Sequence, residues 1–271
     1  MNCLDCGYKE PYSLISITCP HCGSQWREAI YNYPSDWEEL PKLWAKRPFN
    51  LWRYRELLPL SSEESAYPSI SLGEGGTPLI HAANLGAMLG CRHLYIKDER
   101  QGPTASFKDR QGAVAITALK EAGINEAVLA STGNVAISYS AYAVRAGVKL
   151  WAFLTSMVPP EKMREVALYG TQVVKVTGSY DQAKQVAAEF AHQRGLYLER
   201  GARSLPSVES MKTIAYEVAE QITAHFDPPE AKAGGQFTPP WRAPIGISNP
   251  LAAALAPWGY RKDSSSCSRW A

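Results

Sequence analysis

Short apolar strands alternate with longer helical patterns between residues 73 and 226, and this alternation restricts the fold more than any other feature of the chain. The predicted strands are residues 94–97, 127–130, 150–154, 172–176 and 196–199. The predicted helices are residues 107–122, 135–146, 160–169, 180–193 and 208–225. A glycine of the kind that closes helices lies just beyond four of them, at Gly123, Gly147, Gly170 and Gly195. The alternation predicts an α/β fold with a doubly wound parallel sheet.

Two corners between a predicted strand and the next helix carry polar or reactive side chains. The first follows strand 94–97, which reads as buried, and turns through Gly102-Pro103, so that Lys108 falls in the first turn of a helix. The second is Ala-Ser-Thr-Gly-Asn at 130–134. Ligands of doubly wound sheets bind at the carboxyl ends of the strands. We therefore expect both corners to face a ligand site.

Lys108 is the candidate reactive group of the first corner. A lysine in the first turn of a helix lies near the positive end of the helix dipole, which does not stabilise its charge. Partial burial disfavours the ammonium form further and lowers the pKa. A neutral amine is what Schiff-base chemistry needs. The alternative is a solvated surface lysine, which is the commoner state of lysines at helix starts.

The second corner presents backbone N–H groups and the hydroxyls of Ser131 and Thr132, a combination that suits a polar or anionic ligand. Upstream, residues 73–79 read Gly-Glu-Gly-Gly-Thr-Pro-Leu and have the composition of a phosphate loop. No helix pattern follows Pro78, however, because the chain continues as Leu79-Ile80-His81. A plain turn is an equally good interpretation of this glycine-rich segment.

Taken together and in this order, the three motifs resemble the threonine synthase group of pyridoxal-phosphate enzymes over about residues 73–226. That group shares its fold with serine/threonine dehydratases and with the tryptophan synthase β chain. The resemblance implies a fold of this tryptophan synthase β-like type, with its second half incomplete and with a small zinc ribbon added. It also implies pyridoxal 5'-phosphate as cofactor and a small amino acid as substrate.

The same resemblance implies roles for individual residues. Lys108 carries the pyridoxal Schiff base and then acts as the base that removes the Cα proton, while Asn134 hydrogen-bonds the ring hydroxyl of the cofactor. Phe107 belongs to the cofactor site. Substrate-binding roles, mainly to the α-carboxylate, fall on Thr77, Ser131, Thr132 and Gly133.

The implied reaction is the conversion of O-phosphohomoserine to threonine and phosphate. One departure from the family pattern concerns this substrate, because Ser207 stands where a phosphate-binding arginine is expected. A serine hydroxyl cannot make the bidentate, charge-assisted contact of an arginine, although the nearby Arg203 offers a replacement. A serine/threonine dehydratase or β-replacement enzyme is therefore the alternative. A non-catalytic, truncated zinc-binding remnant is the alternative from another class.

The second departure is the C-terminal region, where the family continues for well over a hundred residues. Residues 227–271 are rich in Pro, Ala, Ser and Trp and predict an irregular tail. Codons compatible with residues 253–260, shifted by one nucleotide, read Gly-Leu-Gly-Pro-Leu-Gly-Val, which resembles the family's phosphate-binding loop. A frameshift that truncated an ancestor is the hypothesis, with coincidence among GC-rich codons as its alternative. Such a chain is expected to bind the cofactor weakly or to be inactive.

Two Cys-x-x-Cys pairs near the N-terminus predict a metal site. Four thiolates from two such pairs suit the tetrahedral geometry of structural Zn²⁺, which favours a zinc ribbon over a redox dithiol. The segment 12–17 between the pairs alternates like one strand of a hairpin. The four ligands are Cys3, Cys6, Cys19 and Cys22.

Residues 31–72 are rich in aromatic side chains and proline. Helical spacing relates Trp37, Leu40 and Trp44, and also the apolar residues between 51 and 58. We expect this segment to pack on the main domain instead of forming a partner surface. The predicted division is a zinc ribbon at 1–30, an aromatic linker at 31–72, a partial catalytic domain at 73–226 and a tail at 227–271.

Bulk properties exclude several classes of function. A net charge of +2 and a pI near 8.1 are too mild for a nucleic-acid partner. No apolar run approaches the ~20 residues that cross a bilayer, and the N-terminus lacks the layout of a signal peptide. The expected location is therefore cytoplasmic, with no membrane partner and with a homodimer as the candidate assembly.

Overall fold

A computed structural model describes residues 1–31, 39–60 and 67–226. Its centre is a four-stranded parallel sheet with strand order β7-β6-β5-β8. The strands are β5 (Glu126–Ser131), β6 (Lys149–Thr155), β7 (Gln172–Val176) and β8 (Tyr197–Leu198). The connecting helices are α5 (Asn134–Ala146), α6 (Pro160–Leu168) and α7 (Tyr180–Arg194). The predicted parallel α/β architecture is thereby confirmed for this region.

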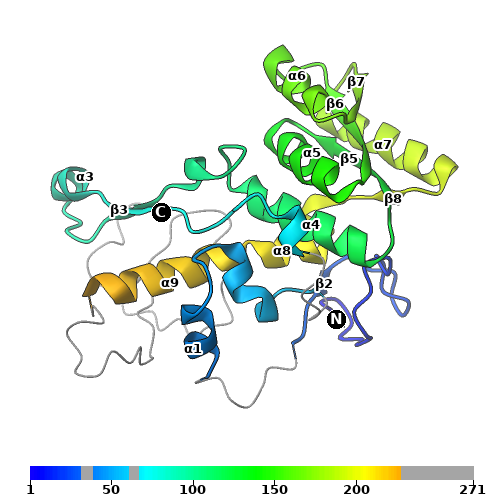
Figure 1. Cartoon of the computed structure of the whole chain (residues 1–271). Helices are drawn as coiled ribbons and strands as arrows, with labels where there is room; N and C mark the ends of the chain where they lie inside the picture. The colour runs from blue at the N-terminus through cyan, green and yellow to red at the C-terminus, as the bar shows by residue number, and fades with distance from the viewer. Residues whose placement is uncertain (32–38, 61–66, 227–271) are drawn as a thin grey trace.

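The sheet is covered on both faces because side chains alternate along its strands. Leu129 of β5 and Leu150 of β6 belong to the buried cluster that includes α5. Val128 and Phe153, which point the other way, pack with α7. Figure 1 shows α5 and α6 on one side of the strands and α7 on the other. Both faces are apolar, which explains why these strands read as continuous hydrophobic runs.

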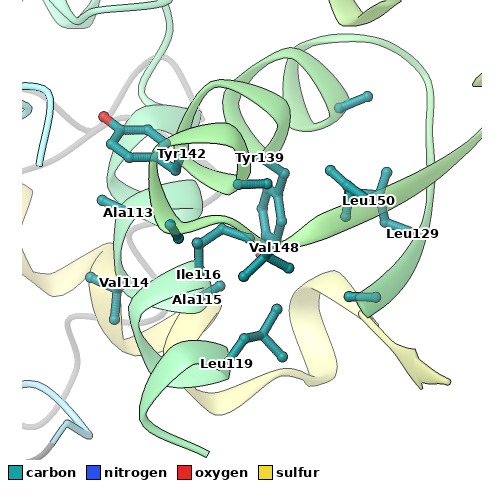
Figure 2. Packing of buried hydrophobic residues seen from close by; sticks show 14 of the residues in the cluster. Ala113, Val114, Ala115, Ile116, Leu119, Leu129, Tyr139, Tyr142, Val148 and Leu150 are labelled. Carbon is teal, nitrogen blue, oxygen red and sulfur yellow. The ribbon is translucent and has the colours of Figure 1, made fainter. Parts of the chain in front are cut away.

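Helix α4 (Lys108–Glu121) is largely buried and lies between α5 and α8 (Leu205–Ser210). Ile116 of α4 lies near Tyr139 of α5 and Val148, and Ala113 lies nearer Tyr142 of α5 (Figure 2). The close approach of α4 and α5 depends on Gly112. A Cβ atom added at this position would lie 2.3 Å from Ser138 Oγ and 2.9 Å from Tyr142 Cδ2.

Two predictions within this region are wrong in detail. Segment 94–97 forms β4 (Tyr95–Lys97), but it pairs antiparallel with β3 (Leu79–His81), and Ile96 is 46% exposed instead of buried. Within the described residues β3 is the only strand that pairs with β4, so β4 lies outside the parallel sheet. Helix 208–225 is two helices, α8 and α9 (Lys212–Phe226), which begin earlier and break at Met211.

Two side-chain hydroxyls bond to backbone carbonyls at the break between α8 and α9. Ser210 Oγ donates to the carbonyl of Ser207 at 2.7 Å, and Thr213 Oγ1 donates to the carbonyl of Ser210 at 2.6 Å. These hydroxyls compete with backbone N–H groups for the carbonyls that a continuous helix uses. The apolar periodicity runs on through the break, so the sequence pattern does not reveal it.

The N-terminal region contains the small antiparallel pair β1 (Asn2–Cys3) and β2 (Arg27–Glu28). The prediction of a strand over 12–17 is wrong, because these residues form turns and irregular backbone. Alternation of side chains over six residues is compatible with a loop when no neighbouring strand offers hydrogen bonds. The other elements are α1 (Glu39–Ala45), η1 (Leu51–Leu57), α2 (Tyr67–Ile70), α3 (Ala83–Leu89), η2 (Glu99–Gln101) and η3 (Gly201–Arg203).

Part of the aromatic segment lies in buried clusters where it is described. Leu51 and Trp52 lie in the same buried cluster as α4, while Trp44 and Tyr54 pack against Tyr216 of α9. Trp37 and the segment 61–65 lie outside the described residues, as does the predicted tail at 227–271. The domain boundaries at 30, 72 and 226 stay predictions. No helix of the described residues has the length and apolar character to cross a membrane.

Candidate functional site

Lys108 opens α4, as the sequence predicts, and the preceding loop is tied to the helix that it starts. Asp109 accepts hydrogen bonds from the backbone N–H of Thr104, at 2.8 Å, and from the Thr104 hydroxyl. Gly102 packs against the same carboxyl group, since a Cβ atom added there would lie 2.5 Å from Asp109 Oδ2. These contacts fix the backbone through which the chain reaches Lys108.

The Lys108 ammonium is half-buried, and burial lowers its pKa from the ordinary lysine value. Its Nζ lies 4.5 Å from the centroid of the Phe107 ring. Among the described residues no carboxylate forms an ion pair with it. A buried amine without a counter-charge loses its proton more readily. The chemistry expected of Lys108 therefore fits its surroundings, and Phe107 is its direct neighbour.

The second corner is built around Ser131. Its hydroxyl oxygen is buried and accepts N–H bonds from Gly133 at 3.0 Å and Ala136 at 3.2 Å, so it caps the start of α5. Thr132 and Asn134 are exposed beside it. The corner thus exposes Thr132 and Asn134, whereas Ser131 chiefly holds the turn. The expected roles of all four residues at 131–134 stay predictions.

The structure brings the two corners together through one contact between their helices. Ser138, one turn into α5, donates from Oγ to the backbone carbonyl of Lys108 at 2.7 Å. The missing side chain of Gly112 leaves room for this approach. The first turn of α4 therefore lies beside α5, the helix that begins at the carboxyl end of β5, where a ligand is expected.

Thr77 lies in a buried polar network. Its hydroxyl donates to Glu99 at 2.5 Å, and its carbonyl accepts from Lys97 Nζ at 2.7 Å. Arg110, almost fully buried, pairs with Glu99 at 2.8 Å and with Glu217 at 2.6 Å. Thr77 is thus linked through Glu99 to Arg110, which lies two residues after Lys108 in α4. The Thr77 hydroxyl is held by protein groups. A direct role at the cofactor stays a prediction.

Electrostatics explain how this network tolerates burial. Burial alone raises the pKa of Glu217, but Arg110 and Lys97 together outweigh that effect and hold the pKa below its usual value. For Lys97, burial dominates and lowers the pKa even though Glu217 opposes the change. Sequence reasoning missed Arg110 and Glu217, because two charged residues 107 positions apart leave no local pattern.

The glycine-rich segment 73–78 serves packing. Gly75 and Gly76 have φ values of 83° and 62°, which L-residues rarely adopt. A Cβ atom added to Gly75 would lie 2.3 Å from the backbone nitrogen of Leu51. One added to Gly76 would lie 2.0 Å from the carbonyl oxygen of Phe49. These glycines let two backbones approach, which accounts for them without a phosphate.

Ser207, which stands where an arginine is expected, is fully buried in α8. It donates from Oγ to Glu199 at 2.9 Å and contacts the Tyr139 hydroxyl at 2.6 Å. Because the serine proton is directed to Glu199, the tyrosine is the donor of the second bond. Arg203 donates to Gln25 Oε1 at 2.6 Å and stacks over Trp26 at 5.3 Å. Both candidate phosphate-binding positions are thus engaged with protein groups.

The four predicted metal ligands come together in the N-terminal region. Their sulfur atoms all lie within 4.8 Å of one another, with Cys3 and Cys19 buried and Cys6 and Cys22 exposed. Burial opposes ionisation of Cys3, but backbone N–H groups of Cys6 and Asp5 outweigh it and lower the pKa of the thiol to about 6. Four clustered cysteines, one of them readily ionised, form a donor set that fits tetrahedral Zn²⁺.

A hollow of about 1000 Å³ lies elsewhere, at the amino ends of β5 and β8. Glu126, Leu196 and Ile17 are among the residues that line it. It faces away from Lys108, and doubly wound sheets bind ligands at the opposite edge. We assign it no role in the chemistry of Lys108.

The sequence pattern of the family described as pyridoxal-phosphate dependent enzyme matches residues 70–232. The threonine synthase of Methanocaldococcus jannaschii is 36% identical over 224 residues, which are 82% of this chain and 54% of that protein. The threonine synthase of Methanosarcina acetivorans is 31% identical over 223 residues, covering 82% and 53%. The chain spans about half the length of these relatives.

Solved structures give the same fold. A pyridoxal 5'-phosphate-dependent aspartate racemase has a TM-score of 0.52 and 28% identity, covering 58% of this chain and 49% of that one. A diaminopropionate ammonia lyase from Escherichia coli in complex with D-serine has a TM-score of 0.56 at 17% identity, covering 59% and 48%.

A parallel sheet covered by helices, with a half-buried lysine at the start of α4 and α4 packed on α5, is that of an α/β protein of the tryptophan synthase β-like fold. The chain belongs to the pyridoxal-phosphate dependent enzyme family, and within it the chain is threonine synthase-like.

Proposed function

We propose that this chain forms the lysine-bearing part of a pyridoxal-phosphate-dependent carbon–oxygen lyase of the threonine synthase type. The observation that carries the proposal is the Ser138–Lys108 contact, which holds the backbone of Lys108 against the beginning of α5. The relatives named threonine synthase, at 31–36% identity, support the same reaction class.

Pyridoxal 5'-phosphate, when bound, supplies an electron sink for carbanion chemistry. Lys108 is the residue that would hold its aldehyde carbon, and its Nζ would move a proton to and from Cα of the amino acid. The backbone donors at the start of α5, with Thr132, would orient the α-carboxylate. Phe107 would exclude water from one side of the Lys108 amine, since the ring lies 4.5 Å from it.

The proposed substrate is O-phosphohomoserine, converted to threonine and phosphate. The burial of Ser207 between Tyr139 and Glu199 favours a second candidate, a dehydratase or β-replacement enzyme acting on serine-like amino acids. Such substrates carry no phosphate and need no cation at position 207. Phosphate release from O-phosphohomoserine, compared with keto-acid formation from serine and threonine, separates the two.

The alternative of another class is a zinc-binding remnant without catalysis. It predicts that the chain saturates with Zn²⁺, shows no visible absorption after addition of pyridoxal phosphate and releases neither product. The lyase proposal predicts a visible absorption band that Lys108→Ala abolishes. Lys120→Ala, at the far end of α4, is the matched control and should leave the band unchanged.

Zn²⁺ is proposed as a structural ion held by Cys3, Cys6, Cys19 and Cys22. Four protein ligands leave no open coordination position, which suits a structural role. The cytoplasmic location and the homodimer stay predictions, and sedimentation of the purified chain measures the second.

A further inference from the structure

Lys162 reaches from α6 to the start of α5. Its Nζ lies 2.7 Å from Asn134 Oδ1, and it is the only described lysine with a contact to the 131–134 corner. No carboxylate of the described residues forms an ion pair with it. Its side chain therefore holds the amide of Asn134 and adds a positive charge beside it.

Gly133 makes the path of this side chain available. A Cβ atom added to Gly133 would lie 3.0 Å from Lys162 Cδ and 3.4 Å from Lys162 Nζ, so a larger residue would push against the lysine. The φ of Gly133, 141°, is a second reason why a side chain is disfavoured there. Lys162 thus lies over the backbone of the corner as well as contacting its exposed amide.

The contact fixes the orientation of the Asn134 amide. A lysine ammonium has three donors and no acceptor, so the atom that faces it must be the oxygen. With Oδ1 turned to the ammonium, the Nδ2 protons point the other way and are the side of the amide that is left to meet a ligand. The ligand atom that meets Asn134 must then be a hydrogen-bond acceptor, and the nearby cation favours one with negative charge.

We propose that Lys162 is a positioning residue of the cofactor site: it holds Asn134 as a hydrogen-bond donor toward an anionic ring oxygen of the cofactor. This inference rests on the proposed function, which makes Asn134 the partner of that oxygen. It also gives Gly133 a role distinct from substrate contact, namely to admit the lysine.

The test compares pyridoxal phosphate with its 3-deoxy analogue, which lacks the ring oxygen. Binding of each is measured by calorimetry to the full chain and to the Lys162→Met variant. Lys162→Met should weaken binding of pyridoxal phosphate about tenfold, the usual effect of losing a hydrogen bond to a charged group, and binding of the analogue less than twofold. Lys162→Arg, which keeps a cationic donor, should recover most of the affinity.

Lys120→Met is the matched control, because Lys120 Nζ contacts Asn125 Oδ1 at 3.4 Å in the same kind of pair at the other end of α4. It should change neither affinity. In an Asn134→Ala background, Lys162→Met should have no further effect on pyridoxal phosphate.

Two outcomes overturn the inference and are distinguishable. Equal losses for both ligands, or none for either, mean that Lys162 acts on the fold or not at all, while the proposed function stands. No saturable binding of pyridoxal phosphate by the unaltered chain removes the proposed function and this inference with it.

Discussion

Ser138 Oγ and the backbone carbonyl oxygen of Lys108 are 2.7 Å apart, and this hydrogen bond joins the two helix starts on which the candidate site depends. It exists only because Gly112 lets the helices approach. Alanine is favoured over glycine inside a helix by about 1 kcal/mol, which by itself would stabilise α4. The added Cβ, 2.3 Å from Ser138 Oγ, opposes that gain.

We predict that the steric effect wins, so that Gly112→Ala lowers the free energy of unfolding by about 1–3 kcal/mol, the usual cost of overpacking. Urea unfolding measures it. Ser138→Ala removes the clashing oxygen, so the double variant should recover part of the loss. A Gly112→Ala protein as stable as the unaltered chain would show that α4 and α5 are not in this contact.

The Arg110–Glu217 ion pair should be essential to stability. Arg110→Met leaves the buried Glu217 with Lys97 as its remaining cation among the described residues, and removal of one partner from a buried pair costs about 3–5 kcal/mol. The exposed pair of Lys184 and Asp181 is the control, where Asp181→Asn should cost less than about 1 kcal/mol. Similar losses in the two variants, measured by chemical unfolding, would argue against the buried network.

Glu199 should make the fold less stable as pH rises. Burial raises the pKa of this carboxyl group above its ordinary value, with the Ser207 hydroxyl opposing the shift. Below the ordinary glutamate pKa both the folded and the unfolded states are protonated. As the pH rises toward the folded-state pKa, only the unfolded state ionises, so stability is lost.

Glu199→Gln should therefore flatten the decline of the unfolding free energy with pH above the ordinary glutamate range. The amide oxygen can still accept from Ser207 and from the Gly201 N–H, at 2.9 and 3.0 Å. Glu189→Gln, on the exposed face of α7, is the control. A pH profile of Glu199→Gln that overlays the unaltered protein would show that Glu199 ionises equally in both states.

The cysteine cluster should bind about one Zn²⁺ ion per chain. Cys19→Ser should lose it, because a buried ligand is replaced by an oxygen that Zn²⁺ prefers less. Cys91→Ser, outside the cluster, should keep full occupancy. Metal analysis after dialysis measures both, and retention of zinc by Cys19→Ser would place the ion elsewhere.

Local periodicity explains which parts of the fold the sequence could predict. β5, β6 and β7 and the helices α4 to α7 lie within one or two residues of their predicted bounds, since each buries a face with the regular spacing of its element. Lys108, at the start of α4, followed from the same patterns. The cysteine cluster followed from spacing alone.

Long-range relationships escaped the sequence. The antiparallel pairing of β4 with β3 depends on which strand lies nearby, and a three-residue apolar run carries no such information. Lys162 lies 28 positions from Asn134, and the two meet because α6 packs on α5. In the sequence Ser207 stands in place of an expected phosphate-binding arginine. Its burial against Glu199 is visible only in the folded chain.

Reduction of the cofactor-treated chain with borohydride, followed by peptide mapping, tests the central claim most directly. The half-buried Lys108 amine, with its lowered pKa and no carboxylate partner among the described residues, should react with pyridoxal phosphate ahead of the exposed lysines. We predict one predominant labelled peptide, containing Lys108, which disappears in Lys108→Ala and persists in Lys120→Ala. Label spread evenly over exposed lysines, or retained in Lys108→Ala, would contradict the account.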